Sequence, residues 1–180
     1  MIGKTIMLQL VNLFFSITPL TRGYGLRARL LRIAGVDCHN SARIVSSCRI
    51  TILNLSIGDD TFIGHQVLVS GNGTSKITIG NDVDIAPRVV ILSGTHEIDM
   101  QGNHSAGECV GKPVWIQDGV WIGSNSTVLP GVTIGRKAVI GAGSVVVHDI
   151  PAFCVADGNP CKPIKQWSPE TWSFEKIIVQ

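Results

Sequence analysis

Aliphatic side chains recur every six residues over most of this chain, and that spacing constrains the fold more than any other feature. An α-helix has a period of 3.6 residues and a plain strand has a period of two, so neither explains it. A period of six fits a very short strand followed by a tight corner, where glycine would accept unusual backbone angles. Hexapeptide repeats predict a parallel β-helix, an all-β solenoid. The repeated positions are Ile57, Ile63, Val69, Ile79, Ile85, Ile91, Ile116, Ile122, Val128, Ile134, Ile140 and Val146.

The composition agrees with a solenoid. The 180 residues suit one domain, and 44% hydrophobic residues with only 6% aromatic ones suit a core of stacked Ile and Val. A formal charge of +2 is too small to predict a nucleic-acid partner. The five cysteines are odd in number and form no Cys-x-x-Cys pair, which argues against a disulfide framework or a zinc knuckle. We therefore expect a reducing compartment, the cytoplasm.

Residues 1–34 predict an N-terminal helical cap of two short helices, broken at Pro19 and at Gly23–Gly25. The apolar stretch Ile6–Leu20 is shorter than the roughly 20 residues that span a bilayer. Arginines follow it, so three interpretations stay open. The helix packs on the open end of the β-helix, or residues 1–34 make peripheral contact with the inner face of a membrane through lipid headgroups, or the stretch spans the membrane.

Two segments depart from the six-residue spacing. The step from Ile91 to Ile116 is 25 residues, so residues 94–113 are predicted to leave the solenoid as a protruding loop. A smaller slip falls at Ser70–Ser75. Beyond residue 165 the spacing ends, and residues 166–180 are predicted to form a tail. There Ser168 and Pro169 resemble the start of a short C-terminal helix.

Three segments of the second half carry a family resemblance: WIGSNSTVLPGVTIG (121–135), IGAGSVVVHDIP (140–151) and GNPCKPIK (158–165). They resemble the hexapeptide-repeat acyltransferases, in the branch of maltose, galactoside and polysaccharide O-acetyltransferases, over roughly residues 35–165. The resemblance implies a left-handed parallel β-helix with three hexapeptides per coil. It also implies a homotrimer that binds acetyl-CoA in the groove between neighbouring subunits, with no metal.

The resemblance places the catalytic histidine of the family in the interrupting loop, at His96. A sugar hydroxyl is a poor nucleophile at neutral pH. An imidazole with a pKa near 6.5 can take its proton while it attacks a thioester. The other ring nitrogen needs a partner that fixes the tautomer. Glu97, Asp99 and a backbone carbonyl all remain candidates.

The resemblance also implies contacts with the coenzyme. Two small residues near the thioester would offer backbone N–H groups to an oxyanion, and a third would contact the pantetheine arm. Two positions hold Val-His where close relatives often have Thr-Lys, and two lysines would meet the phosphates. These predicted contacts are Gly123, Ser124, Ala142, Val147, His148, Lys162 and Lys165.

Arg88 stands where sugar acetyltransferases of the family have an acceptor-binding asparagine, and it is predicted, with Asp99, to contact the acceptor. Arginine donates hydrogen bonds but cannot accept them, so it would suit an acidic sugar or simply pair with Asp84 or another carboxylate.

The resemblance predicts an acetyl-CoA-dependent O-acetyltransferase acting on a sugar of a bacterial surface polysaccharide or its precursor. Amino sugars, serine and antibiotics are alternative acceptors, and other short acyl groups are alternative donors. Two other classes remain. A zinc hydratase needs three neutral histidines around one metal, and His65, His96 and His104 lack the spacing of that family. A non-catalytic hexapeptide scaffold is the third class, because fold alone does not imply activity.

Overall fold

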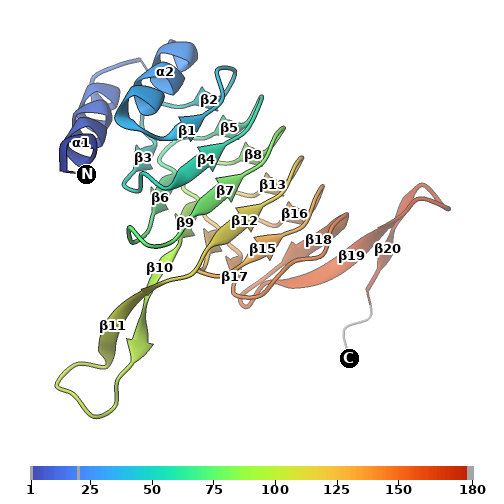
Figure 1. Cartoon of the computed structure of the whole chain (residues 1–180). Coiled ribbons are helices and arrows are strands. Elements are labelled where there is room, and N and C mark those ends of the chain that lie inside the picture. The colour runs from blue at the N-terminus through green and yellow to red at the C-terminus, as the bar shows by residue number, and fades with distance from the viewer. Residues whose placement is uncertain (1, 20, 178–180) are drawn as a thin grey trace.

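The computed structural model describes residues 2–19 and 21–177. Two helices, α1 (Ile2–Ser16) and α2 (Tyr24–Ala34), cover one end of a stack of short strands, and two hairpins project from the stack (Figure 1). The stack consists of three sheets whose strands within the stack run parallel. The hexapeptide spacing therefore corresponds to a parallel solenoid.

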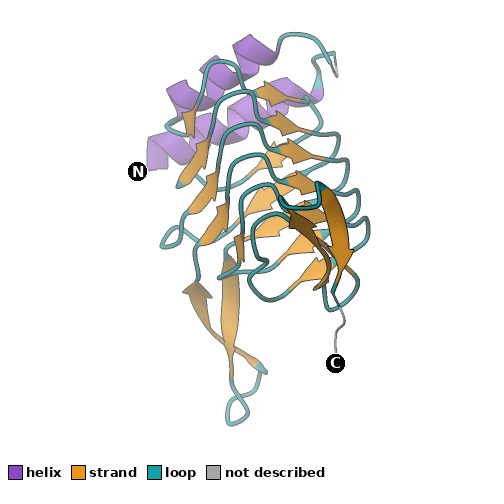
Figure 2. Ribbon diagram, turned by 90° about the vertical axis from the view of Figure 1, so that its right-hand side faces the viewer, coloured by secondary structure: helices purple, strands orange, loops and turns teal. Residues whose placement is uncertain are grey.

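The chain visits the three sheets in strict rotation, so three strands complete one coil. The first sheet holds β1 (Asp37–Cys38), β4 (Leu55–Ile57), β7 (Ile77–Ile79), β12 (Val114–Ile116) and β15 (Thr133–Ile134). The second holds β2 (Arg43–Ile44), β5 (Phe62–Ile63), β8 (Asp84–Ile85), β13 (Trp121–Ile122) and β16 (Val139–Ile140). The third holds β3 (Arg49–Ile50), β6 (Leu68–Ser70), β9 (Val90–Leu92), β14 (Thr127–Val128) and β17 (Val145–Val146). Coils 1 to 5 are thus β1–β3, β4–β6, β7–β9, β12–β14 and β15–β17 (Figure 2).

The core is a set of columns in which each aliphatic side chain stacks on its counterpart in the next coil. In the second sheet, Ile63 pairs in register with Ile85, and Ile85 pairs with Ile122. All three are fully buried. Burying a side chain of this size stabilises the fold by about 1.5–3 kcal/mol, so the columns supply most of the cohesion between coils.

The repeat glycines serve a different purpose from the one that the sequence predicts. We expected them to supply unusual backbone angles, but the left-handed position lies two residues after each of them, at Asp60, Gln66, Asp82, Asn125, Lys137 and Gly143. The glycines allow close approach instead. A Cβ on Gly123 would lie 2.6 Å from the backbone nitrogen of Ala142, and one on Gly135 would lie 2.4 Å from that of Ala152. Glycine is present because the next coil leaves no room for a side chain.

The helices close the first coil by satisfying its open strand edges. The Asn12 side chain of α1 donates to the Ile50 carbonyl at 2.7 Å and accepts from the Ile50 N–H at 3.1 Å. Arg27 of α2 is buried, and its guanidinium donates to the Ile44 carbonyl at 2.8 Å. Two helix side chains therefore replace the neighbouring coil that β2 and β3 lack, as the end of a solenoid requires.

The predicted C-terminal helix is wrong. After coil 5 the chain forms β18 (Cys154–Asp157), then reverses into β19 (Lys162–Ser168) and β20 (Ser173–Lys176), an antiparallel hairpin that extends the second sheet. The dipeptide Ser168–Pro169 is typical of a turn as well as of a helix start. Here it begins the turn between β19 and β20. Trp167 packs edge-on against Trp172 and Phe174, which favours the hairpin. Residues 178–180 of the predicted tail lie outside the described residues.

Candidate active site

His96 lies on β10 (Gly94–Ile98), which pairs with β11 (Ala106–Gly111) in the antiparallel hairpin that interrupts the coils. The segment predicted as a loop is therefore an ordered arm. Nδ1 of His96 lies 2.9 Å from the Gly107 carbonyl. Because a carbonyl only accepts, Nδ1 carries the proton and Nε2 of the neutral ring keeps its lone pair. The partner left open by the sequence is a backbone carbonyl, and Nε2 is the basic atom.

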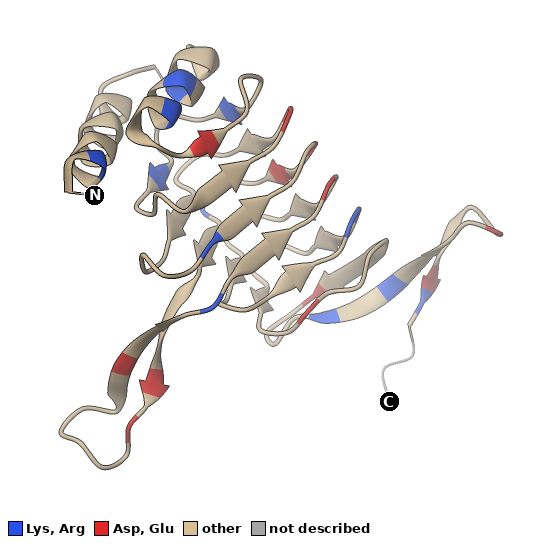
Figure 3. Ribbon diagram, viewed as in Figure 1, with Lys and Arg blue, Asp and Glu red and all other residues tan. Residues whose placement is uncertain are grey.

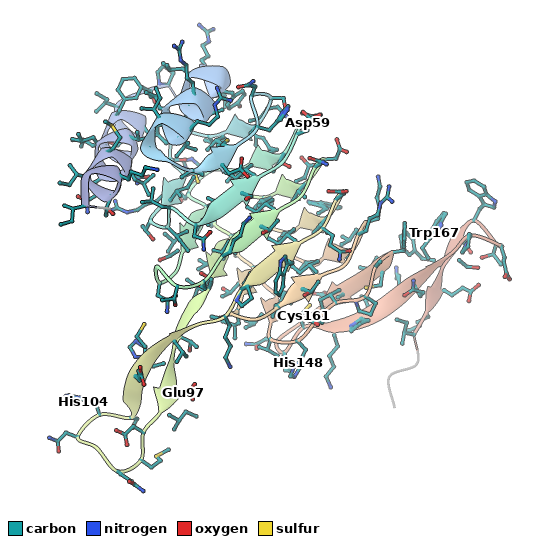
Figure 4. The ribbon with its side chains drawn as sticks, in the orientation of Figure 1. Asp59, Glu97, His104, His148, Cys161 and Trp167 are labelled. Carbon is teal, nitrogen blue, oxygen red and sulfur yellow. The ribbon has the colours of Figure 1, made fainter. Side chains whose placement is uncertain are left out.

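Neither of the two carboxylates considered as partners, Glu97 and Asp99, holds the His96 ring. Asp99 accepts the N–H groups of Gln101 at 2.8 Å and Gly102 at 2.9 Å, and these bonds, with that of Gly102 the larger influence, hold its pKa below the ordinary value. Asp99 thereby closes the hairpin turn. Glu97 follows His96 on the hairpin (Figure 4), where the strand pairing shifts register, and among the described residues it makes no hydrogen bond to the His96 ring.

A hollow of about 210 Å³ opens beside His96 where the hairpin leaves the coils. Sequence reasoning missed two of its polar residues, Asn72 and Cys109. The Asn72 amide lies 3.8 Å from the Cys109 sulfur, and Cys109 pairs directly across the hairpin from His96. The only signal for Asn72 was the four-residue slip at Ser70–Ser75. Lining the hollow are Ser70, Gly71, Asn72, Leu92, Gly94, Thr95, His96 and Cys109.

The base of the hairpin is tied to that slip. Ser75 and Ser93 are both buried, and the Ser75 hydroxyl lies 2.7 Å from the Ser93 hydroxyl and 3.0 Å from the Ser93 carbonyl. Gly111 ends β11 against the same segment, since a Cβ there would lie 2.2 Å from the Asn72 side-chain oxygen. The segment 71–75 therefore sets the angle at which the arm carrying His96 leaves the coils.

Most predicted coenzyme contacts, and Arg88, fall on one edge of the solenoid, the corner between the second and third sheets. Arg88 lies there in coil 3, Gly123 and Ser124 in coil 4, and Ala142 in coil 5. The Arg88 N–H donates to the His65 carbonyl of coil 2 at 2.8 Å, and the Gly143 N–H donates to the Ser124 carbonyl at 2.8 Å, so these corners stack directly. Lys162 continues the column, because it pairs with Asp157 just below coil 5. The stacked corners form a continuous edge of the solenoid, along which an extended ligand can bind.

The remaining predicted residues lie elsewhere. Val147 and His148 directly follow β17, at the corner between the third and first sheets from which the His96 hairpin also leaves. Lys165 lies further along β19, opposite Val155. Strand β17 of the third sheet lies between Ala142 and Val147, so the two sets of residues occupy opposite edges of that sheet. A single chain therefore does not bring His96 onto the column of Gly123, Ser124 and Ala142.

The Gly123 N–H cannot make the predicted oxyanion contact, because it already has a hydrogen-bond partner. The Gly123 N–H donates to the Ile140 carbonyl at 2.8 Å, as one of the bonds between coils 4 and 5. That N–H is not available to a ligand without breaking the stack. Of the predicted pair, the Ser124 amide is the candidate donor.

Asp84 forms no ion pair with Arg88, and its carboxylate lies 4.0 Å from the guanidinium of Arg43 instead. Among the residues that the structure describes, no carboxylate forms an ion pair with Arg88, whose side chain is exposed. An exposed guanidinium without a partner is free to bind an anionic or hydroxyl-bearing ligand. Within residues 2–19 and 21–177, no group of three His, Cys, Asp or Glu side chains is placed to hold a metal ion.

Comparisons with known proteins agree with this geometry. The family described as "Bacterial transferase hexapeptide (six repeats)" matches residues 113–148. A maltose O-acetyltransferase from Clostridium difficile 630 is 34% identical, with a TM-score of 0.79 over 92% of this chain and 87% of that structure. A Vibrio cholerae hexapeptide-repeat acetyltransferase, solved with acetyl coenzyme A, is 27% identical, with a TM-score of 0.73 over 92% of this chain and 88% of that one.

Among curated sequences, the galactoside O-acetyltransferase of Escherichia coli K12 is 39% identical over 113 residues, which are 63% of this chain and 54% of the relative. The chain spans about half the length of the curated relatives that it matches.

Proposed function

Because this chain belongs to the hexapeptide-repeat acyltransferase family, we propose that it transfers an acetyl group from acetyl-CoA to a hydroxyl of a sugar. The observation that carries the proposal is the orientation of the His96 ring. Its Nδ1 is tied to a carbonyl, so Nε2 is left as a base beside a hollow. The names of the maltose and galactoside relatives support a sugar as acceptor, and the Vibrio cholerae structure supports acetyl-CoA as donor.

The proposed reaction has two steps. Nε2 of His96 takes the proton of a sugar hydroxyl while the oxygen attacks the thioester carbonyl. The resulting tetrahedral intermediate carries an oxyanion that the Ser124 amide of a neighbouring subunit would stabilise. The carbon–sulfur bond then breaks, the acetyl group stays on the sugar, and the leaving thiolate takes the proton from His96. General base catalysis of this kind contributes about 10² to 10⁴ in rate.

The separation of the two corners supports a site built between subunits. His96 leaves one edge of the third sheet, whereas Arg88, Ser124 and Ala142 lie on the other. A homotrimer would place the hairpin of one chain against the column of its neighbour, with acetyl-CoA in the groove between them. Left-handed coils and a cytoplasmic location are part of the same proposal. The lysines at 162 and 165 would meet the coenzyme phosphates, and Val147 and His148 would contact the coenzyme through their backbone.

The acceptor that we propose is a sugar of a surface polysaccharide or of its precursor. Arg88 supports an acceptor that carries an anionic group, because its exposed guanidinium has no carboxylate partner among the described residues. Asp99 stays a predicted acceptor contact at the far end of the hairpin.

Calorimetric titration with acetyl-CoA tests the proposal without knowledge of the acceptor. We expect saturable binding near one site per chain. A Ser124→Pro variant lacks the candidate amide donor, so it should fold but transfer acetyl to an acceptor more slowly than the wild type. Failure of folded protein to bind acetyl-CoA at low salt would refute the proposal. Acceptors are then screened by thiol release, with neutral, acidic and amino sugars compared.

A further inference from the structure

Helix α1 exposes a continuous apolar stripe on the side away from the solenoid. Leu8, Val11 and Phe15 face the solenoid and are buried, as an amphipathic helix requires. The opposite surface repeats the pattern toward solvent, where a soluble helix normally carries charge. Half or more of the residue is exposed at four positions of α1, Ile2, Ile6, Leu10 and Leu13, and at Ile17 directly after the helix. Their spacing of three or four residues places them in one stripe along the helix.

Helix α2 continues this surface. Leu26 and Ile33 are each at least half exposed, and Arg29 lies between them at helical spacing. Phe14 of α1 and Leu26 of α2 both line a hollow of about 190 Å³, with Arg22 at its rim. The two helices therefore share one apolar face, and arginines border it.

The charge around this face has one sign. Residues 1–36 hold one lysine and four arginines and no acidic residue, although the whole chain carries a formal charge of only +2. Arg27 of α2 is buried and Arg32 donates to the Cys38 carbonyl at 3.4 Å, whereas Arg22 and Arg29 are exposed. Figure 3 shows basic but no acidic positions on the two helices. The acidic residues all come later in the chain. An apolar stripe with a cationic border has the chemistry that complements an anionic lipid surface.

We propose that α1 and α2 dock this protein on an anionic lipid bilayer, with the α1 stripe in the headgroup–acyl boundary and the exposed arginines on lipid phosphates. The helices lie flat. No helix in the described ranges has the length and apolarity to cross a membrane. Long arginine side chains can bury their methylene stems and keep the guanidinium at the headgroups, so Arg29 fits between two apolar neighbours.

A second copy of the chain fits the same face less well. A two-fold interface would set the patch against itself and bring the arginines of both copies together around a shared apolar core. Like charges at such a border oppose association, whereas lipid phosphates neutralise them. The helices and the tip of the His96 hairpin lie at opposite ends of the molecule in both views (Figures 1 and 2). This arrangement is compatible with docking through the helices. A docked protein keeps the hairpin in water.

Vesicle flotation of the full chain tests the proposal. The probes are vesicles of phosphatidylcholine alone and of phosphatidylcholine mixed with phosphatidylglycerol. We expect at least about tenfold stronger partitioning onto the anionic vesicles, and loss of that advantage at high salt as screening sets in. A Leu10→Gln/Leu13→Gln variant should bind about a hundredfold more weakly, because two buried apolar side chains are lost. An Arg22→Gln/Arg29→Gln variant should bind neutral and anionic vesicles alike.

The matched control is Ile98→Gln/Met100→Gln, which removes two exposed apolar side chains from the hairpin instead of the helices. It should partition like the wild type, and circular dichroism confirms that each variant folds. Absence of wild-type flotation with anionic vesicles at low salt overturns the proposal. So does wild-type-like binding by the Leu10/Leu13 variant. A wild-type assembly that ignores vesicles and dissociates in that variant would assign the face to a second copy and likewise overturn it.

Discussion

The coil stack and the His96 hairpin are both β-structure, but they are held together in opposite ways. Coil strands are two or three residues long, and their inward side chains are buried in columns that cross all five coils. The hairpin strands β10 and β11 are five and six residues long, mostly exposed, and paired with each other alone. Stability therefore resides in the coils, and the proposed base sits on an arm that the stack does not need. We therefore expect substitutions in the coils to lower stability and substitution of His96 to lower activity.

The largest effect that we expect is on activity. His96→Ala should lower kcat/KM for acetyl transfer by about 10² to 10⁴, since the base for the hydroxyl proton is lost. The midpoint of urea unfolding should stay the same, because the His96 side chain is exposed. Thiol release and urea denaturation measure the two quantities. His104→Ala, on the same hairpin, is the control, and an equal loss of activity in both variants would mean that the arm matters only as a structure.

The next effect is on stability. Ile85→Ala empties a fully buried position between Ile63 and Ile122, in the middle of a column. We expect the free energy of unfolding to fall by about 2–5 kcal/mol. Asp84→Ala changes the outward side chain of the same strand and should change it by less than about 0.5 kcal/mol. Comparable losses from both variants in urea denaturation would contradict the column description.

A smaller loss tests why the repeat glycines are present. In Gly123→Ala the new Cβ would lie 2.6 Å from the Ala142 nitrogen and 2.8 Å from the Ile140 oxygen, and both are backbone atoms that hold coils 4 and 5 together. We expect a loss of about 1–3 kcal/mol by overpacking. Gly73→Ala, where no atom lies within 4 Å, should be close to neutral. If thermal denaturation ranks the two variants in the reverse order, close approach does not explain the glycines.

The smallest effect concerns the hairpin turn. The N–H groups of Gly102 and Gln101 depress the pKa of Asp99 below its unfolded value of 3.8. A carboxylate with a lowered pKa stabilises the turn above pH 3.8, and that contribution is lost as the pH falls through the folded pKa. Amide exchange at Gln101 and Gly102 should therefore speed up below about pH 4 relative to the coils. Asp99→Asn should show no such pH dependence, and a turn that stays protected at low pH would refute the assignment.

The sequence predicts the coils well because a solenoid repeats one local rule. Each aliphatic position from Ile57 to Val146 needs only its neighbour one coil away, so spacing alone places it. The C-terminal helix failed for the opposite reason. The Ser168–Pro169 signal is local, and the contacts that decide it, Trp167 with Trp172 and Phe174, form only when the chain reverses.

The site was partly predictable. The family resemblance predicts the base at His96 and coenzyme contacts at Gly123, Ser124 and Ala142, and these roles stay predictions. It does not show that the partner of His96 is the Gly107 carbonyl, since a backbone group has no sequence signature. Nor does it show that the Gly123 N–H is already used between coils, because that bond depends on register.

The interruption between coils 3 and 4 leaves the stack intact. Ile79 still pairs with Ile116 in the same register that joins Ile116 to Ile134, although the chain between the first two is about twice as long. Doubling a loop adds only about 0.6 kcal/mol to its closure. For an evolving lineage, this corner is an inexpensive place to insert sequence. The arm can be lengthened, trimmed or exchanged while every coil keeps its register. Under the proposed function, a change of the arm would alter acceptor preference while the scaffold barely changes.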